Sequence, residues 1–260
     1  MIKALFFDID GTLVSFRTHS IPASTIEALE RAKAAEVKVF IATGRPVPFI
    51  DNLGAVEHLI DGYVTTNGAF CFVNKEVILR KVIPQEAVRK MACFSAAEGF
   101  ACVYVGERNI VLQNPNDTLR DIFYNRLKVK TQDESLPLEL VFSDNIIQMS
   151  PIVPEDEGNR MMKELTECIS GRWHPAFMDV TAKEADKGEG LKTMAAHFGI
   201  KPEETMAFGD GGNDTAMIRC AGVGVAMGNA IENLKSEADY VTASVDEDGV
   251  RQALLHWHVI

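Results

Sequence analysis

The feature that most constrains the fold is the hexapeptide DIDGTL at residues 8–13, which directly follows the apolar run 4–7. A short apolar run is typical of a buried strand, and the carboxyl ends of such strands form the ligand-binding edge of open α/β sheets. Residues two apart in extended backbone point to the same side, so we expect Asp8 and Asp10 to project together. The alternative is an ordinary turn in which Asp caps, Gly bends and Thr bonds locally.

Two neighbouring carboxylates raise each other's pKa unless a cation or a proton lies between them. The expected cation is a hard, oxygen-seeking ion such as Mg2+, which leaves one carboxylate free to attack phosphorus. Asp8 is then the candidate nucleophile. Asp10 is the candidate general acid and base, protonating the leaving alkoxide and deprotonating the attacking water. A loop that binds a structural cation is the alternative for this motif alone.

Thr43, Gly44 and Arg45 follow a second apolar run, residues 37–42. We expect Thr43 to offer its hydroxyl and neighbouring backbone N–H groups to phosphate oxygens, while Gly44 gives the backbone flexibility. Arg45 lies at the same strand end and is a candidate substrate-binding residue. A strand-ending turn is the alternative interpretation of these residues.

Lys187 precedes a helix whose apolar residues recur with helical spacing between positions 191 and 198. As a compact point charge, its ammonium group suits phosphate. Lys183 and Lys192 are rivals that spacing alone does not eliminate. A solvated surface lysine is the alternative for any one of the three.

The motif GDGGND at residues 209–214 follows a short apolar run, 205–208. Its glycines let the backbone fold tightly, Asp210 and Asp214 add hard oxygen ligands, and Asn213 adds a neutral hydrogen-bond partner for substrate. A glycine-rich calcium or turn loop is the alternative. Because each motif stands beside an apolar run, their joint occurrence favours one shared site.

The two ends of the chain alternate strand and helix signals. They predict an α/β core of residues 1–82 and 185–260, whose parallel sheet takes six strands from both ends. An S-x-x-E capping-box pattern predicts that the first helix starts at Ser24.

Residues 83–184 have a different pattern. Adjacent strand signals at 101–105 and 109–113, joined by a turn at Gly106, favour an antiparallel α+β insert. Helices are predicted near 119–127 and 161–169, and strands at 146–149 and 177–180. We therefore predict an inserted second domain; one compact α/β unit is the alternative.

The formal net charge of -11 argues against non-specific nucleic-acid binding, which draws on basic surface. Five widely spaced cysteines without a CxxC pair fit buried, reduced thiols in a cytoplasmic protein. No apolar stretch approaches the ~18 residues of a membrane span, and no obligate protein partner is indicated.

Taken together, DIDGTL, TGR, Lys187-Gly188 and GDGGND resemble the four motifs of the haloacid dehalogenase (HAD) superfamily. The insert resembles the C2B caps of class IIB, Cof-type sugar-phosphate phosphatases. The likeness covers essentially the whole chain, and it selects Lys187 through the pattern K-G-x-x-L. It implies a HAD-like Rossmannoid core with an inserted cap that closes over the site.

The resemblance also implies residue roles. Asp8 would be the nucleophile, Asp10 the acid/base, and Thr43 and Lys187 the phosphate ligands. The residues implied to hold Mg2+ are Asp8, the Asp10 carbonyl and Asp210, supported by Asn213 and Asp214.

The expected function is a Mg2+-dependent phosphatase acting on small phosphorylated metabolites, in particular sugar phosphates, through an aspartyl phosphate. A phosphomutase, which passes the phosphoryl group to a sugar hydroxyl, is the alternative. A non-enzymatic metal- or metabolite-binding regulator is disfavoured because no expected catalytic position is replaced.

Overall fold

The computed structural model describes residues 1–126 and 129–260, with the backbone alone at position 173. The chain divides into two compact units. Unit 1 comprises residues 1–45, 50–79 and 186–260, and unit 2 comprises residues 46–49 and 80–185. The segment 46–49 belongs with unit 2, where the ring of Phe49 packs edge-on against that of Phe123. The sequence-based division at 82/83 and 184/185 stays a prediction.

The sheet of unit 1 is built around parallel strands, which confirms the predicted α/β class. Its strand order is β13-β12-β11-β1-β2-β3-β4-β5. Neighbours from β13 to β3 are parallel, whereas β4 runs antiparallel to β3. The bounds are β1 Ala4–Phe7, β2 Lys38–Ala42, β3 Gly62–Thr65, β4 Phe70–Val73, β5 Glu76–Arg80, β11 Thr205–Gly209, β12 Val223–Ala226 and β13 Tyr240–Val241.

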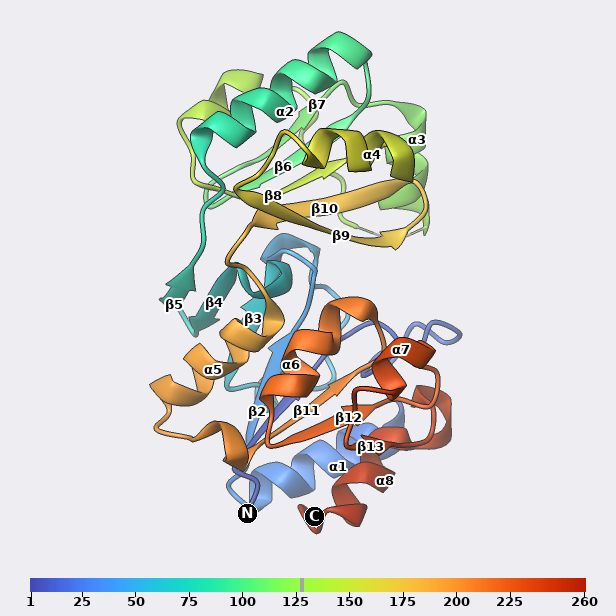
Figure 1. Ribbon diagram of the computed structural model, residues 1–260. Coiled ribbons are helices and arrows are strands. Elements are labelled where there is room, and N and C mark those ends of the chain that lie inside the picture. The colour runs from blue at the N-terminus through green and yellow to red at the C-terminus, as the bar shows by residue number, and fades with distance from the viewer. Residues whose placement is uncertain (127–128) are drawn as a thin grey trace. The chain divides into compact units, whose positions relative to one another are not determined.

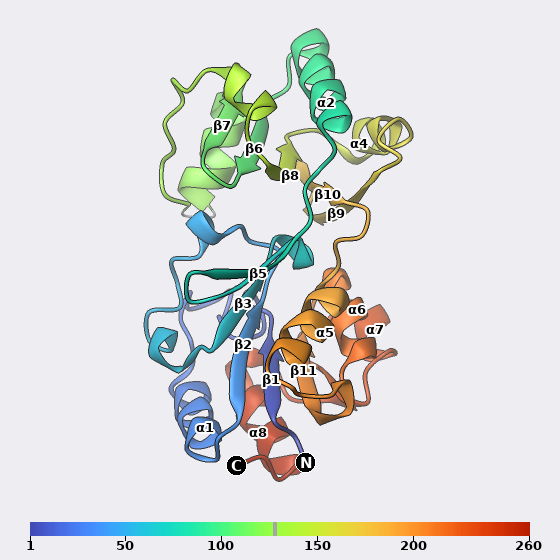
Figure 2. The same cartoon turned by 90° about the vertical axis from the view of Figure 1, so that its left-hand side faces the viewer.

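Alternation along the strands sends side chains into two separate cores. Leu5 and Phe7 of β1 face helices α1 (Ala23–Ala34) and α8 (Gly249–His256). Ala4 and Phe6 face α5 (Lys187–His197) and α6 (Thr215–Cys220) on the other side. Figures 1 and 2 show these helix pairs covering opposite faces of the sheet. Each fully buried large apolar side chain contributes about 1.5–3 kcal/mol.

The first helix starts one residue before the predicted position, and the capping box is wrong. Pro22 precedes α1 with extended backbone and forms no side-chain cap. Ser24 lies inside the first turn, and its hydroxyl donates to Asp248 at 2.5 Å. A tertiary partner therefore takes the hydroxyl that the local pattern assigned to capping.

Unit 2 contains an antiparallel sheet of order β7-β6-β8-β10-β9. Its strands are β6 Cys102–Gly106, β7 Ile110–Gln113, β8 Ile146–Pro151, β9 Cys168–His174 and β10 Phe177–Ala182. Helices α2 (Gln85–Glu98) and α4 (Glu155–Met162) contribute to the apolar core on one face. Helix α3 (Asp117–Arg120) and the π-helical turn Asp121–Arg126 contribute to the core on the other.

The predicted helix at 161–169 is wrong. Helix α4 ends at Met162, and residues from Cys168 onward form strand β9. Pro154 and an acidic first turn favour a helix start at Glu155, because carboxylates are stabilised at helix N-termini. The predicted helix at 119–127 corresponds to α3 and the π-helical turn, and residue 127 lies outside the described residues.

The remaining described elements are short. They are helix α7 Glu232–Lys235 and the 3-10 turns Val47–Phe49, Glu57–Leu59, Thr66–Gly68, Leu138–Phe142, Pro202–Glu204, Gly212–Asp214 and Val245–Glu247.

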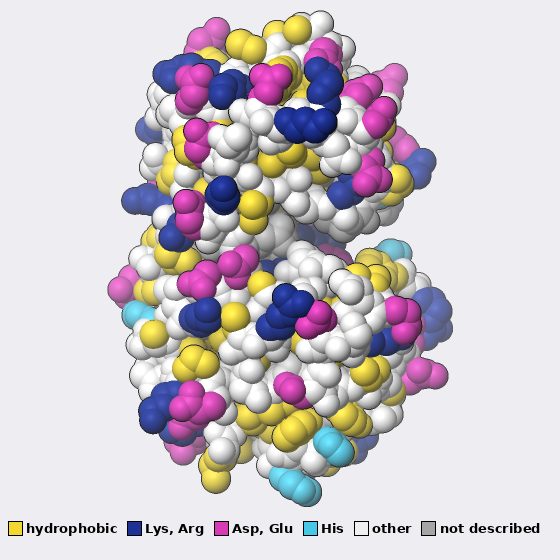
Figure 3. All heavy atoms as spheres, viewed as in Figure 1, with side chains coloured by type: hydrophobic (Ala, Val, Ile, Leu, Met, Phe, Trp, Pro, Cys, Tyr) yellow, Lys and Arg dark blue, Asp and Glu magenta, His cyan; other side chains and the backbone are white. Residues whose placement is uncertain are grey.

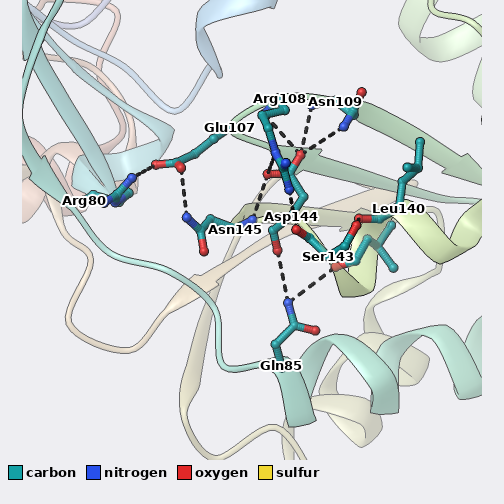
Figure 4. A network of polar contacts seen from close by, with 10 residues as sticks. Arg80, Gln85, Glu107, Arg108, Asn109, Leu140, Ser143, Asp144 and Asn145 are labelled. Carbon is teal, nitrogen blue, oxygen red and sulfur yellow. Dashed lines mark hydrogen bonds and ion pairs between the residues drawn. The ribbon is translucent and has the colours of Figure 1, made fainter.

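A buried carboxylate organises the β6–β7 turn of unit 2 (Figure 4). The Asp144 side chain is only 2% exposed and accepts hydrogen bonds from the backbone N–H groups of Arg108, Asn109 and Asn145. Gln85, at the start of α2, donates to the carbonyl of Asp144 at 3.1 Å. The network therefore joins the turn to the start of a helix.

Three of the five cysteines are buried, as expected, and two are not. Cys71, Cys102 and Cys168 are buried, but Cys220 is half-buried and Cys93 is exposed, and all are free. Burial raises the pKa of Cys71 to about 12 and that of Cys168 to about 11, so both remain thiols at neutral pH.

The surface carries charges of both signs. On the face shown in Figure 3, basic and acidic side chains are interspersed over both units. Among the described residues, none of the helices combines the length and the apolar content that crossing a membrane requires.

Candidate active site

The centre of the site is an ion pair between strand β1 and helix α5. Asp8 follows β1, and its backbone N–H donates to the carbonyl of Phe208 in β11, so the sheet fixes its position. Lys187 is the first residue of α5 and is fully buried. Its Nζ lies 2.6 Å from Asp8 Oδ1 and 2.6 Å from Asp214 Oδ1. Residues from three distant parts of the chain therefore meet at one point.

The rivals of Lys187 lie elsewhere. Lys183 and Lys192 are both exposed, and Lys192 pairs with Glu189 at 2.9 Å. The K-G-x-x-L pattern therefore falls on the lysine whose ammonium group contacts Asp8.

Asp8, Asp210 and Asp214 form a group that fits a divalent metal. Each offers a carboxylate oxygen, and these oxygens lie within 4.8 Å of one another. Lys187 supplies one positive charge against the three carboxylates. The remaining negative charge is what a hard divalent cation would compensate.

The pKa shifts report this excess of negative charge. Burial raises the pKa of Asp8 well above its ordinary value; Lys187 opposes the shift, while the neighbouring carboxylates add to it. Burial and then Asp214 raise the pKa of Asp210 to about 7. Burial disfavours the charge on Lys187, but Asp214 and Asp8 outweigh it and raise the lysine pKa.

Asp210 and Asp214 differ in the hydrogen bonds they accept. Asp214 accepts from Lys187 through Oδ1 and from the backbone N–H groups of Asp210 and Gly211 through Oδ2, at 3.0 and 2.9 Å. It therefore organises its own loop. Asp210 accepts a 3.2 Å hydrogen bond from the hydroxyl of Thr12. Asp8 and Asp210 are thus better suited to ligate a metal, with Asp214 in support.

Asp10 has a cation of its own. Its carboxylate receives two bonds from Arg45, Nε to Oδ2 at 2.7 Å and Nη2 to Oδ1 at 2.8 Å. Its carboxylate is outside the group formed by Asp8, Asp210 and Asp214. Each aspartate of the DxD motif is therefore paired with a different basic residue.

Thr43 and Gly44 lie next to this pair. Thr43 is buried, its backbone N–H donates to Val64, and its Oγ1 accepts a hydrogen bond from the backbone N–H of Arg45. A Cβ at Gly44 would lie 3.0 Å from Oδ1 of Asn67, so a larger residue would crowd that side chain.

Asn213 contacts Asn67, the residue that lies against Gly44. Its Nδ2 donates to Oδ1 of Asn67 at 3.0 Å. Thr66 and Asn67 both have positive φ, +50° and +52°. Positive φ is costly for a β-branched residue such as Thr66, and such strain concentrates at functional sites.

Two residues of the site were not predicted from the sequence. Thr12 donates to Asp210, and Asn229 donates to the carbonyl of Gly11 at 2.8 Å. Asn229 follows β12, and a polar residue just after an apolar run is the signal that could have indicated it as a site residue. Gly11 itself has φ +84°, which favours glycine.

Residues 5–254 match the family model described as haloacid dehalogenase-like hydrolase. The chain belongs to this family.

Solved structures and sequence relatives agree with the family match. The structure of the HAD subclass IIB sugar phosphatase BT4131 is 52% identical with a TM-score of 0.94, covering 99% of this chain and 100% of that one. BT1666 of Bacteroides thetaiotaomicron, described among the HAD phosphatases, is 35% identical with a TM-score of 0.90, covering 100% and 96%. The 5-amino-6-(5-phospho-D-ribitylamino)uracil phosphatase YcsE of Bacillus subtilis strain 168 is 30% identical over 257 residues, covering 98% of this chain and 96% of its own.

The chain is therefore a HAD phosphatase of the class IIB, Cof type, as its motifs predicted. Phosphatases of this superfamily generally use a divalent metal, and Asp8, Asp210 and Asp214 fit that requirement.

Proposed function

We propose that this HAD phosphatase is Mg2+-dependent and hydrolyses small phosphorylated metabolites, hexose phosphates in particular, through an aspartyl phosphate on Asp8. The observation that carries the proposal is the contact of the buried Lys187 with both Asp8 and Asp214. An ionised carboxylate beside a fixed ammonium group and a metal-binding group of carboxylates suits phosphoryl transfer, which depends on positioning and charge stabilisation.

The proposed reaction has two steps. An Asp8 oxygen forms a bond to phosphorus as the bond to the sugar oxygen breaks, and Asp10 gives the leaving alkoxide its proton. Water then attacks the phosphorus, its proton passes to Asp10, and the electron pair of the broken bond returns to Asp8. When bound, Mg2+ would be held by Asp8, Asp210 and the Asp10 carbonyl, and it would neutralise charge between the carboxylate and the phosphoryl group.

The other predicted residues bind the substrate in this proposal. Thr43 and Lys187 contact phosphoryl oxygens, while Gly44, Arg45 and Asn213 line the same strand ends. Support for a sugar phosphate comes from the 52% likeness to a structure described as a sugar phosphatase. The relative YcsE is named as a phosphatase of a phosphoribitylamino compound, which also carries a polyhydroxylated chain.

Phosphate release from a panel of phosphorylated metabolites tests this function. We expect release from hexose phosphates with Mg2+, loss of release with a chelator, and recovery when Mg2+ is added back. No release from any member of the panel would contradict the proposal. An isomeric sugar phosphate in place of free phosphate would support the phosphomutase alternative.

A further inference from the structure

Arg45 and Asp10 form a two-bond pair. The guanidinium meets the carboxylate edge to edge, with both nitrogen–oxygen distances below 3 Å. Both bonds are charge-assisted, and such paired bonds fix the plane of the carboxylate as well as its position. A lysine, whose ammonium is a point charge, would not fix that plane.

The surroundings hold both partners of this pair in place. The Arg45 side chain is 18% exposed and that of Asp10 is 33% exposed. The backbone N–H of Arg45 donates to Oγ1 of Thr43, and Nη1 of Arg45 lies 3.9 Å from Asp51. Asp10 forms a β-bridge with Val14. The pair therefore joins two fixed backbone segments of unit 1.

The pair bears on the two half-reactions, which are formation of the aspartyl phosphate and its hydrolysis. Both oxygens of the Asp10 carboxylate accept a hydrogen bond from Arg45, so this carboxylate is held as a hydrogen-bond acceptor, as a general base must be. An oriented acceptor is required when water attacks the aspartyl phosphate, whereas the first half-reaction requires a proton donor at the leaving oxygen. The arrangement therefore suits the second half-reaction.

We infer that Arg45 is a positioning residue for Asp10, which orients the Asp10 carboxylate as the general base of aspartyl-phosphate hydrolysis. This inference rests on the proposed function. In this step the water oxygen bonds to phosphorus, the water proton passes to Asp10, and the bond between phosphorus and Asp8 breaks. Arg45 thus acts on turnover through Asp10.

Pre-steady-state kinetics with p-nitrophenyl phosphate and Mg2+ separate the two half-reactions. The burst of nitrophenolate reports formation of the Asp8 phosphate, because this leaving group departs without a proton. The steady rate that follows reports its hydrolysis. In Arg45→Met we expect the steady rate to fall about 10- to 100-fold, more than the burst rate does, because a misplaced catalytic group costs about that factor.

A double-mutant cycle tests whether the effect passes through Asp10. Asp10→Asn should show the same selective loss, and the combined variant should be no slower than Asp10→Asn alone. Arg45→Lys keeps the charge without the two parallel bonds, so it should lie between Arg45→Met and the native protein. Arg219→Met is the matched control, because Arg219 makes a similar two-bond pair with Glu237 outside the site.

Equal losses of burst and steady rate in Arg45→Met and Arg45→Lys would overturn the inference, as would additive losses in the combined variant. Those results would place Arg45 on the phosphoryl group itself. If the native protein released neither nitrophenolate nor phosphate, the proposed function would fail first, and the inference with it.

Discussion

Lys187 carries a buried charge whose cost is offset by two carboxylates. A buried ion pair is strongly destabilised when one partner is removed, because the remaining charge is uncompensated. Lys187 contacts both Asp8 and Asp214, so its charge stays compensated while Asp8 changes its bonding during the proposed reaction. The same ammonium group thus serves both the fold and the chemistry.

At the scale of single residues, we expect Asp8→Asn to abolish turnover while the fold stays intact. The amide keeps the shape and an oxygen acceptor for Lys187, but it loses the nucleophilic carboxylate. Phosphate release from a hexose phosphate should fall by more than about 10⁴-fold, as for other nucleophile replacements. Circular dichroism checks the fold, and the exposed Asp117→Asn is the control. Undiminished activity in Asp8→Asn would refute the covalent scheme.

At the scale of elements, the turn Thr66–Gly68 and the start of helix α5 lie in close contact. Gly68 has φ +88°, and a Cβ there would lie 2.0 Å from the carbonyl oxygen of Asp186. Asp186 is the residue that caps α5 through its side chain. The glycine therefore permits the close approach that holds the helix carrying Lys187.

We expect Gly68→Ala to lower the free energy of unfolding by about 3 kcal/mol or more, since it adds overpacking to an unfavourable positive φ. Gly199→Ala is the matched control. Gly199 also has positive φ, +67°, but a Cβ there meets nothing within 4 Å. Its cost should be about 1 kcal/mol. Urea unfolding measures both, and equal losses would contradict the role of the close contact.

In unit 2, the β6–β7 turn depends on the buried Asp144 side chain. Asp144→Ala removes the acceptor of three backbone N–H groups, so we expect the free energy of unfolding to fall by about 2–4 kcal/mol. Asp117→Ala, at a fully exposed side chain, should have a much smaller effect. Urea unfolding of the two variants provides the comparison; similar losses would count against the network.

At the scale of the whole molecule, the raised carboxylate pKa values link stability to pH and to metal. In the metal-free protein, folded Asp8 and Asp210 bind protons at a pH where the unfolded chain has released them. Stability from these groups is therefore greatest below about pH 4, where the unfolded chain also binds the protons, and falls as the pH rises toward 7. A bound divalent cation takes the place of the protons and should remove this decline.

We expect the metal-free native protein to lose on the order of 1–3 kcal/mol more unfolding free energy between pH 4.5 and pH 7 than Asp210→Asn does. Adding Mg2+ at pH 7 should stabilise the native protein, because the ion binds the folded state preferentially. Urea unfolding at both pH values, with chelator and with Mg2+, measures this. If the metal-free native protein gained stability relative to Asp210→Asn as the pH was raised, the raised pKa of Asp210 would be contradicted.

The parallel α/β framework, and the places of the four motifs at strand and helix ends, followed from the order of residues alone. Apolar runs and glycine-containing turns are local signals, and parallel strands bring their ends to one edge of the sheet. Local signals failed where a tertiary partner intervened, as for Ser24, or where helical spacing of apolar residues continued beyond the end of a helix, as at Cys168. The hairpin β4–β5 was not predicted, although both strands contain short apolar runs; none of the β5 side chains is fully buried, so its apolar run does not reflect a core position.

The pairing of charges could not be predicted from the amino-acid sequence. It placed Lys187 between Asp8 and Asp214, and it gave Asp10 to Arg45. Asp8 and Lys187 are 179 positions apart, and Asp10 and Arg45 are 35 apart. No local pattern encodes a contact across such separations, because it forms only when packed strands and helices bring the side chains together.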